Sequence, residues 1–121
     1  MQIYIKTDKI MVMLILLKQK ATKEQIEEAS KDLENYVKFV VDIEREIMTI
    51  GGTRHYLGEA MLLEDGSRQS NLWGGGYDLK NKIIDHESLI NIRSGDNNPN
   101  KVVLSEKIRD KMTNIFNTLY V

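Results

Sequence analysis

The sequence predicts an α+β fold, a two-layer sandwich in which a mixed β-sheet carries two helices packed on one face. Three observations favour it: an apolar run of eight residues near the start, an amphipathic helical pattern followed by a stretch that alternates with a period of two, and a second amphipathic pattern at the end. The chain has 121 residues and neither repeats nor a low-complexity linker. We therefore expect a single domain spanning residues 1–121.

The first element is the apolar run IMVMLILL at residues 10–17. A bilayer-spanning helix needs roughly 20 apolar residues, so the run predicts no membrane span. A strand covered on both faces inside a sheet gives such a continuous apolar pattern. Residues 1–10 precede the body of the domain, at residues 11–121, as a tail or an edge strand.

A helix follows the run. Thr22 and Gln25 have the spacing of a capping box, and the apolar residues Ile26, Ala29 and Leu33 recur at helical intervals. The sequence then alternates, with Val37, Phe39, Val41 and Ile43 on one side and charged residues on the other, which predicts a strand that ends at the glycine pair 51–52. We expect this β-α-β crossover to join two parallel strands.

The second half predicts an antiparallel meander. The Asp65-Gly66 pair is typical of a tight hairpin between two strands, and SLINIR, residues 88–93, predicts another strand. The closing helix has Ser105 as its N-cap. Its apolar face consists of Ile108, Met112, Ile115, Phe116 and Leu119.

The segments LLEDGSRQSNLWG and SLINIR are the densest motifs of the chain. Together they resemble a family of short prokaryotic proteins catalogued only as a domain of unknown function. The resemblance runs from the first apolar strand to the last helix. It implies a single domain, and because the family has no assigned activity it implies no mechanism.

Composition restricts the classes of function. Lysine and arginine total 17 against 18 acidic residues, so the strong positive field of a nucleic-acid binder is absent. The chain has no cysteine, which excludes disulfides and thiolate metal sites and predicts a reducing, cytoplasmic location. We expect self-association as a symmetric homodimer, the commonest closed assembly for domains with exposed sheet edges.

The leading candidate site is the segment around the single tryptophan. On a strand, Gln69, Asn71 and Trp73 share one face, and Arg93 on the SLINIR strand can lie beside them. An arginine next to an indole ring offers charge and a stacking surface. We interpret the protein as a small binding or assembly domain that recognises an anionic ligand or an acidic segment of a partner protein, without a cofactor.

The alternative is a metal-dependent hydrolase. Asp42 and Glu44 lie on one face of the alternating strand, and His55 and Glu59 follow its turn. Oxygen-rich ligand sets of this kind suit Mg²⁺ or Mn²⁺, which would activate water. Alternating carboxylates are more often the solvated face of a strand, so whether the protein is an enzyme stays open and the binding interpretation leads. The two interpretations differ in whether the four side chains converge.

Overall fold

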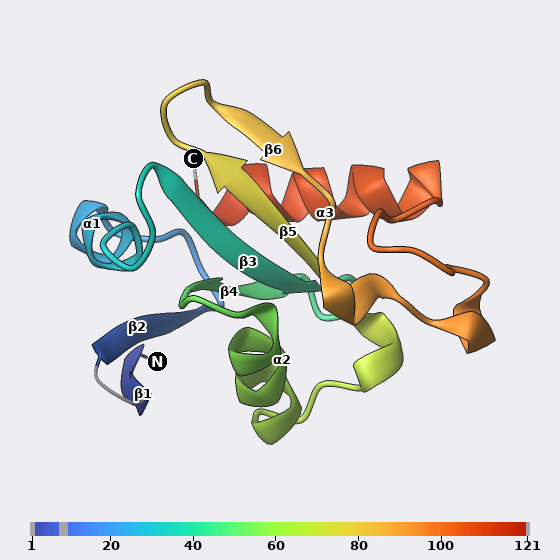
Figure 1. The fold of residues 1–121 in the computed structure, drawn as a ribbon, viewed down its shortest axis with the longest axis horizontal. Helices are drawn as coiled ribbons and strands as arrows, with labels where there is room; N and C mark the ends of the chain where they lie inside the picture. The colour runs from blue at the N-terminus through green and yellow to red at the C-terminus, as the bar shows by residue number, and fades with distance from the viewer. Residues whose placement is uncertain (1, 8–9, 121) are drawn as a thin grey trace.

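The computed structural model describes residues 2–7 and 10–120. Within these residues six strands form one sheet in the order β1-β2-β4-β3-β5-β6, with three α-helices packed on it (Figure 1). This confirms the α+β class. The elements are β1 (Gln2–Thr7), β2 (Ile10–Leu17), α1 (Lys23–Ala29), β3 (Tyr36–Asp42), β4 (Ile47–Gly51), α2 (His55–Glu64), β5 (Leu72–Asp78), β6 (Ile83–Asp85) and α3 (Glu106–Leu119).

The sheet is antiparallel at every pairing of these strands, which corrects the predicted mixed sheet. β2 and β3 do run in the same direction, as the crossover predicts, but β4 lies between them and pairs antiparallel with both. The cause is a hairpin turn inside the segment predicted as one strand. Asp42 accepts hydrogen bonds from the backbone N–H groups of Glu44 and Arg45, both at 2.9 Å, and Glu46 adopts a φ of 57°.

β2 matches the predicted buried strand. Residues 12–17 are buried, and the strand pairs with β1 on one side and β4 on the other. Its side chains alternate between two cores, with Ile15 in one and Leu16 in the other. A strand buried on both faces therefore accounts for the continuous apolar run. β1 forms the outer edge of the sheet.

Helices cover both faces of the sheet, which corrects the prediction of two helices on one face. The core that contains Phe39 lies under α1 and α3, whereas the core that contains Val40 lies under α2. α3 crosses behind β5 in Figure 1. The Thr22–Gln25 capping box and the Ser105 N-cap are both confirmed. In the part of the chain that the structure describes, no helix has the length and apolar character needed to cross a membrane.

The Asp65-Gly66 pair ends α2 and is not a hairpin turn. Gly66 has a φ of 101°, its N–H donates to Leu63 O, and the N–H of Ser67 donates to Leu62 O at 3.0 Å. These are the two hydrogen bonds of a Schellman motif, which needs a left-handed residue just after a helix. The SLINIR segment is likewise not a strand. It forms a 3₁₀ turn at Leu89–Asn91.

Candidate functional site

The glycine run of β5 makes room for side chains on the α2 side of the sheet. Leu72 belongs to the core under α2, and strand alternation puts Gly74 and Gly76 on the same side. A Cβ at Gly76 would overlap the phenol of Tyr36, and one at Gly74 would lie 2.7 Å from Ser88 Cβ. Because the two glycines have no side chains, Tyr36 and Ser88 can lie directly against this part of β5.

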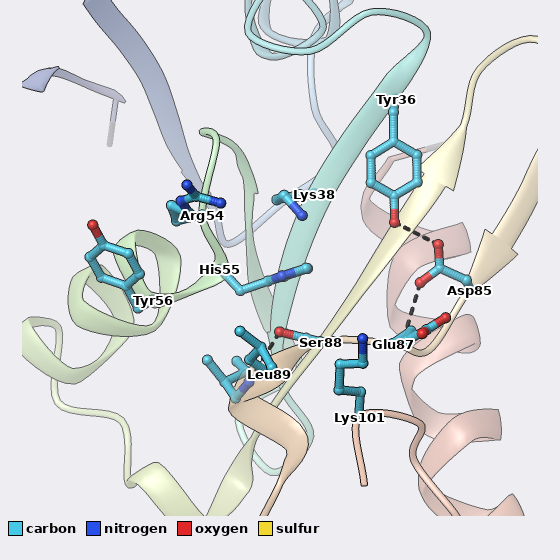
Figure 2. Close-up of a pocket in the computed structure, with 11 residues that line it drawn as sticks. Tyr36, Lys38, Arg54, His55, Tyr56, Asp85, Glu87, Ser88, Leu89 and Lys101 are labelled. Carbon is cyan, nitrogen blue, oxygen red and sulfur yellow. Dashed lines mark hydrogen bonds between the residues drawn. The ribbon is translucent and has the colours of Figure 1, made fainter.

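A cavity of about 360 Å³ lies at this place, between β3, the start of α2 and the segment after β6. Figure 2 shows side chains from all three converging on it. Its lining residues are Tyr36, Lys38, Arg54, His55, Tyr56, Asp85, Glu87, Ser88, Leu89, Ile90 and Lys101.

His55 enters the cavity because α2 packs very close to the sheet. A Cβ at Gly58 would overlap the hydroxyl of Thr49, so only glycine permits this approach. His55 lies one turn earlier, and its Nε2 is 2.7 Å from Gly75 O. A carbonyl oxygen only accepts, so Nε2 carries the hydrogen and Nδ1 has a free lone pair. Burial lowers the pKa of His55 to about 4, and the ring is neutral at pH 7.

Tyr36 and Asp85 form the opposite wall. The phenol donates a hydrogen bond of 2.6 Å to Asp85, whose other carboxylate oxygen accepts from Glu87 N at 3.1 Å. Burial, together with the hydrogen bond to Asp85, raises the pKa of Tyr36. The phenol is therefore a fixed hydrogen-bond donor, and the carboxylate is already occupied.

Three cations border the cavity: Lys38, Arg54 and Lys101. None of their side chains makes a hydrogen bond or an ion pair with the residues that the structure describes. Lys38 and Lys101 extend their amino groups into the space from opposite sides (Figure 2). Burial lowers the pKa of Lys38, the charge of Arg54 lowers it further, and Asp85 opposes this effect.

The predicted Trp73 and Arg93 pair does come together, with the guanidinium 4.1 Å from the centre of the indole ring. However, Trp73 is 3% exposed and Arg93 is 8% exposed. Arg93 donates to the backbone oxygens of Ser70 and Ile90, and its Nη1 is 3.6 Å from Asp96. The stack is covered, so it offers no open binding surface.

Gln69 and Asn71, the other two residues of this candidate site, lie in a 3₁₀ turn before β5 instead of on a strand. Gln69 is exposed and Asn71 is half-buried. The strand alternation that places them on one face with Trp73 therefore does not apply to them.

The four residues predicted as alternative metal ligands do not lie together in the structure. Asp42 is fully buried and its carboxylate holds the β3–β4 turn, where Glu44 is exposed. His55 lies in the cavity, and Glu59 lies on α2. Among the described residues, no three histidine, cysteine or acidic side chains form a group that could hold a metal ion. The convergence that the hydrolase interpretation requires is not found.

Of the residues that line the cavity, only His55 is a candidate site residue on the basis of the sequence. A signal for others was present, because Tyr36 and Lys38 alternate with the apolar residues of β3, and Gly74 and Gly76 alternate on β5. What the sequence does not show is the pairing of β3 with β5, which sets Lys38 opposite Gly76.

Comparison with known proteins identifies the family of the chain but assigns no activity to it. Neither a curated protein nor a solved structure matches the chain. One family model, described as a protein of unknown function (DUF5674), matches residues 15–119. This range includes every residue that lines the cavity and confirms the resemblance to an uncharacterised family. The chain belongs to the DUF5674 family.

Proposed function

We propose that this protein binds a small anionic ligand in the cavity between β3, α2 and the segment after β6. The observation that carries the proposal is the group of three cations, Lys38, Arg54 and Lys101, around one space. Their side chains make no hydrogen bond or ion pair with the described residues. Lys38 is half-buried, and the like charge of Arg54 disfavours its ammonium form. A bound carboxylate or phosphate would relieve that repulsion.

The volume of the cavity and its other lining residues restrict the size and chemical class of the ligand. A volume of about 360 Å³ is at the small end of ligand pockets, which suits a metabolite and not a polymer. Leu89 and Ile90 add an apolar side. Tyr36 already donates its hydroxyl hydrogen to Asp85, so its oxygen can only accept a hydrogen bond from a hydroxyl group of the ligand. We infer a small organic acid or phosphate ester with a short apolar part.

The site differs from the one predicted around Trp73 and Arg93, while the class of ligand is the same. Both sites place cationic side chains next to a surface that can receive an anion. The burial of Arg93 favours the cavity, because the guanidinium is covered and its Nε and Nη1 already donate to backbone oxygens.

Thermal unfolding in the presence of anions tests the proposal. Inorganic phosphate and citrate are titrated separately against a chloride control at constant ionic strength, because a ligand that binds the native state raises the melting temperature. We expect at least one of them to raise it. Lys101→Met should reduce the shift, whereas Lys111→Met, a lysine bordering a different hollow, should not. No shift with either anion, or an equal shift in the Lys101→Met variant, would overturn the proposal.

A further inference from the structure

Lys38 is set apart from the other two cations by its position. It lies on β3 inside the sheet, directly opposite Gly76 of β5, and the phenol of Tyr36 occupies the space over that glycine. Its amino group is 5.7 Å from the centre of the Tyr36 ring and makes no hydrogen bond or ion pair to a described residue. Arg54 and Lys101 are exposed by comparison. Lys38 is thus a half-buried amine that reaches into a cavity.

The groups around Lys38 come from every element that borders the cavity. Arg54 and His55 lie at the start of α2, Asp85 ends β6, and Glu87 and Lys101 lie in the long segment before α3. The carboxylate of Asp85, whose charge acts on Lys38, accepts from Tyr36 and from a backbone N–H. Burial disfavours the ammonium form and is the main cause that lowers the pKa of Lys38. The carboxylate of Asp85 opposes this effect, and the charge of Arg54 adds to it.

A lysine that is desolvated and lies next to another cation is a recognised arrangement for an amine nucleophile. Lysine is suited to this role because its pKa shifts readily on burial, whereas arginine keeps its charge. The cavity also holds a neutral imidazole, His55, whose Nδ1 is free to carry a proton. A site that only neutralised an anion would need neither of these features.

We propose that Lys38 forms an imine with the carbonyl group of a small oxo acid bound in the cavity. The inference rests on the proposed function, because Arg54 and Lys101 would hold the acid group of the ligand. The lone pair of Nζ attacks the carbonyl carbon, a C–N bond forms, and the carbonyl oxygen becomes a hydroxyl. The hydroxyl then leaves as water with the second amine hydrogen, and a C=N bond remains. The Nδ1 atom of His55 carries the proton between nitrogen and oxygen.

Reductive trapping tests the step directly. The wild-type protein is incubated with glyoxylate, the smallest oxo acid, and sodium cyanoborohydride, which converts an imine into a stable secondary amine. Intact mass and peptide mapping then locate the added carboxymethyl group. We expect labelling of Lys38 to exceed that of the exposed Lys31 and Lys80 several-fold near neutral pH, because burial lowers the pKa of Lys38 and the neighbouring cations would hold the acid group beside it.

Matched variants and a neutral aldehyde test whether the labelling depends on Lys38 and on the acid group of glyoxylate. Lys38→Arg keeps the charge and should abolish the preferred adduct, whereas Lys111→Arg should retain it. Acetaldehyde, which lacks the acid group, should label Lys38 less selectively than glyoxylate. Equal labelling of Lys38 and the exposed lysines by glyoxylate would overturn the imine proposal. If phosphate or citrate still raised the melting temperature, the proposed anion site would stand without it, so the two failures are distinguishable.

Discussion

The side chain of Asn91 makes the hydrogen bonds to β5 that a neighbouring strand would otherwise make. It is fully buried beside β5, where its carboxamide accepts from Gly74 N at 2.8 Å and donates to Gly74 O at 2.9 Å. It also donates to Lys101 O at 3.0 Å. β6 pairs with β5 only from Gly76 onward, so this amide satisfies the part of the edge that β6 leaves open. It also positions the segment that carries Ser88 and Lys101 against the cavity.

Asn91→Ala should therefore be strongly destabilising. The substitution leaves the N–H and C=O of Gly74 buried without partners, and each such group costs about 1–3 kcal/mol. We expect the free energy of unfolding, measured with urea, to fall by about 3 kcal/mol. Asn81→Ala is the control, because the Asn81 amide donates only to Asp78 on the surface. A loss of similar size in both variants would contradict this role for Asn91.

His55 predicts a pH dependence of stability. Its pKa is about 4 in the folded protein, below the ordinary value of 6.5, because burial disfavours the charged ring. Between these values the unfolded chain binds the proton and the folded chain does not, so stability decreases as the pH falls from about 6.5 to about 4. The loss from this residue should be of order 3 kcal/mol.

Urea unfolding across that pH range measures the effect. His55→Gln keeps a polar group of similar reach and should flatten the slope between pH 6.5 and 4, whatever its effect on absolute stability. A slope identical to that of the wild-type protein would show that another group is responsible.

At the scale of elements, the sequence predicted β2, the start of α1 and all of α3, because each has a strong local signal. The capping box, the Ser105 N-cap and the unbroken apolar run act within a few residues. The β3–β4 turn was missed because it has no glycine or proline, and a buried carboxylate of Asp42 holds it instead. A pattern of hydrophobic residues does not predict such a hydrogen-bonding contact.

The sequence predicts the first strand of a hairpin where α2 lies, for the opposite reason. Its local signals are present but ambiguous. Asp65-Gly66 suits a hairpin turn as well as a helix end, and Gly58 weakens a helical pattern. Gly58 is explained only by the close contact of α2 with Thr49 on β4, which is a tertiary requirement. The cavity depends on that contact, and so the sequence did not predict it.

The close contact between Gly76 of β5 and the phenol of Tyr36 can be tested by substitution. Gly76→Ala puts a methyl group where the phenol of Tyr36 lies, so the ring must move and the Tyr36–Asp85 hydrogen bond is strained or lost. We expect thermal and urea unfolding to show a loss of about 2 kcal/mol, the typical cost of overpacking.

Gly95→Ala is the matched control for this substitution. A Cβ at Gly95 has no heavy atom within 4 Å, and its φ is not in the left-handed region. Its stability should change by less than about 0.5 kcal/mol. Equal effects at the two glycines would show that the space beside Tyr36 is not tightly packed.

At the scale of the whole molecule, we predict self-association as a symmetric dimer through the outer edge of β1. β1 is first in the sheet order, and its Ile3 and Tyr4 side chains are 36% and 60% exposed. Free edge strands pair readily with a second copy of themselves. Light scattering should give the dimer mass at high concentration, and Ile3→Lys should lower it. A monomer mass at every concentration would contradict the prediction.

The position of β4 between β2 and β3 determines the order in which the sheet can be assembled. β3 meets β4 across a short turn, whereas β2 meets β4 at residues roughly thirty positions further along the chain. Closing a long loop costs more conformational entropy than closing a short one, and contacts distant in sequence slow folding. We therefore expect the two local pairings, β1 with β2 and β3 with β4, to form before β2 meets β4. Until then, one edge of β2, the most apolar segment of the chain, lacks its partner strand. During that interval the nascent protein is most exposed to aggregation.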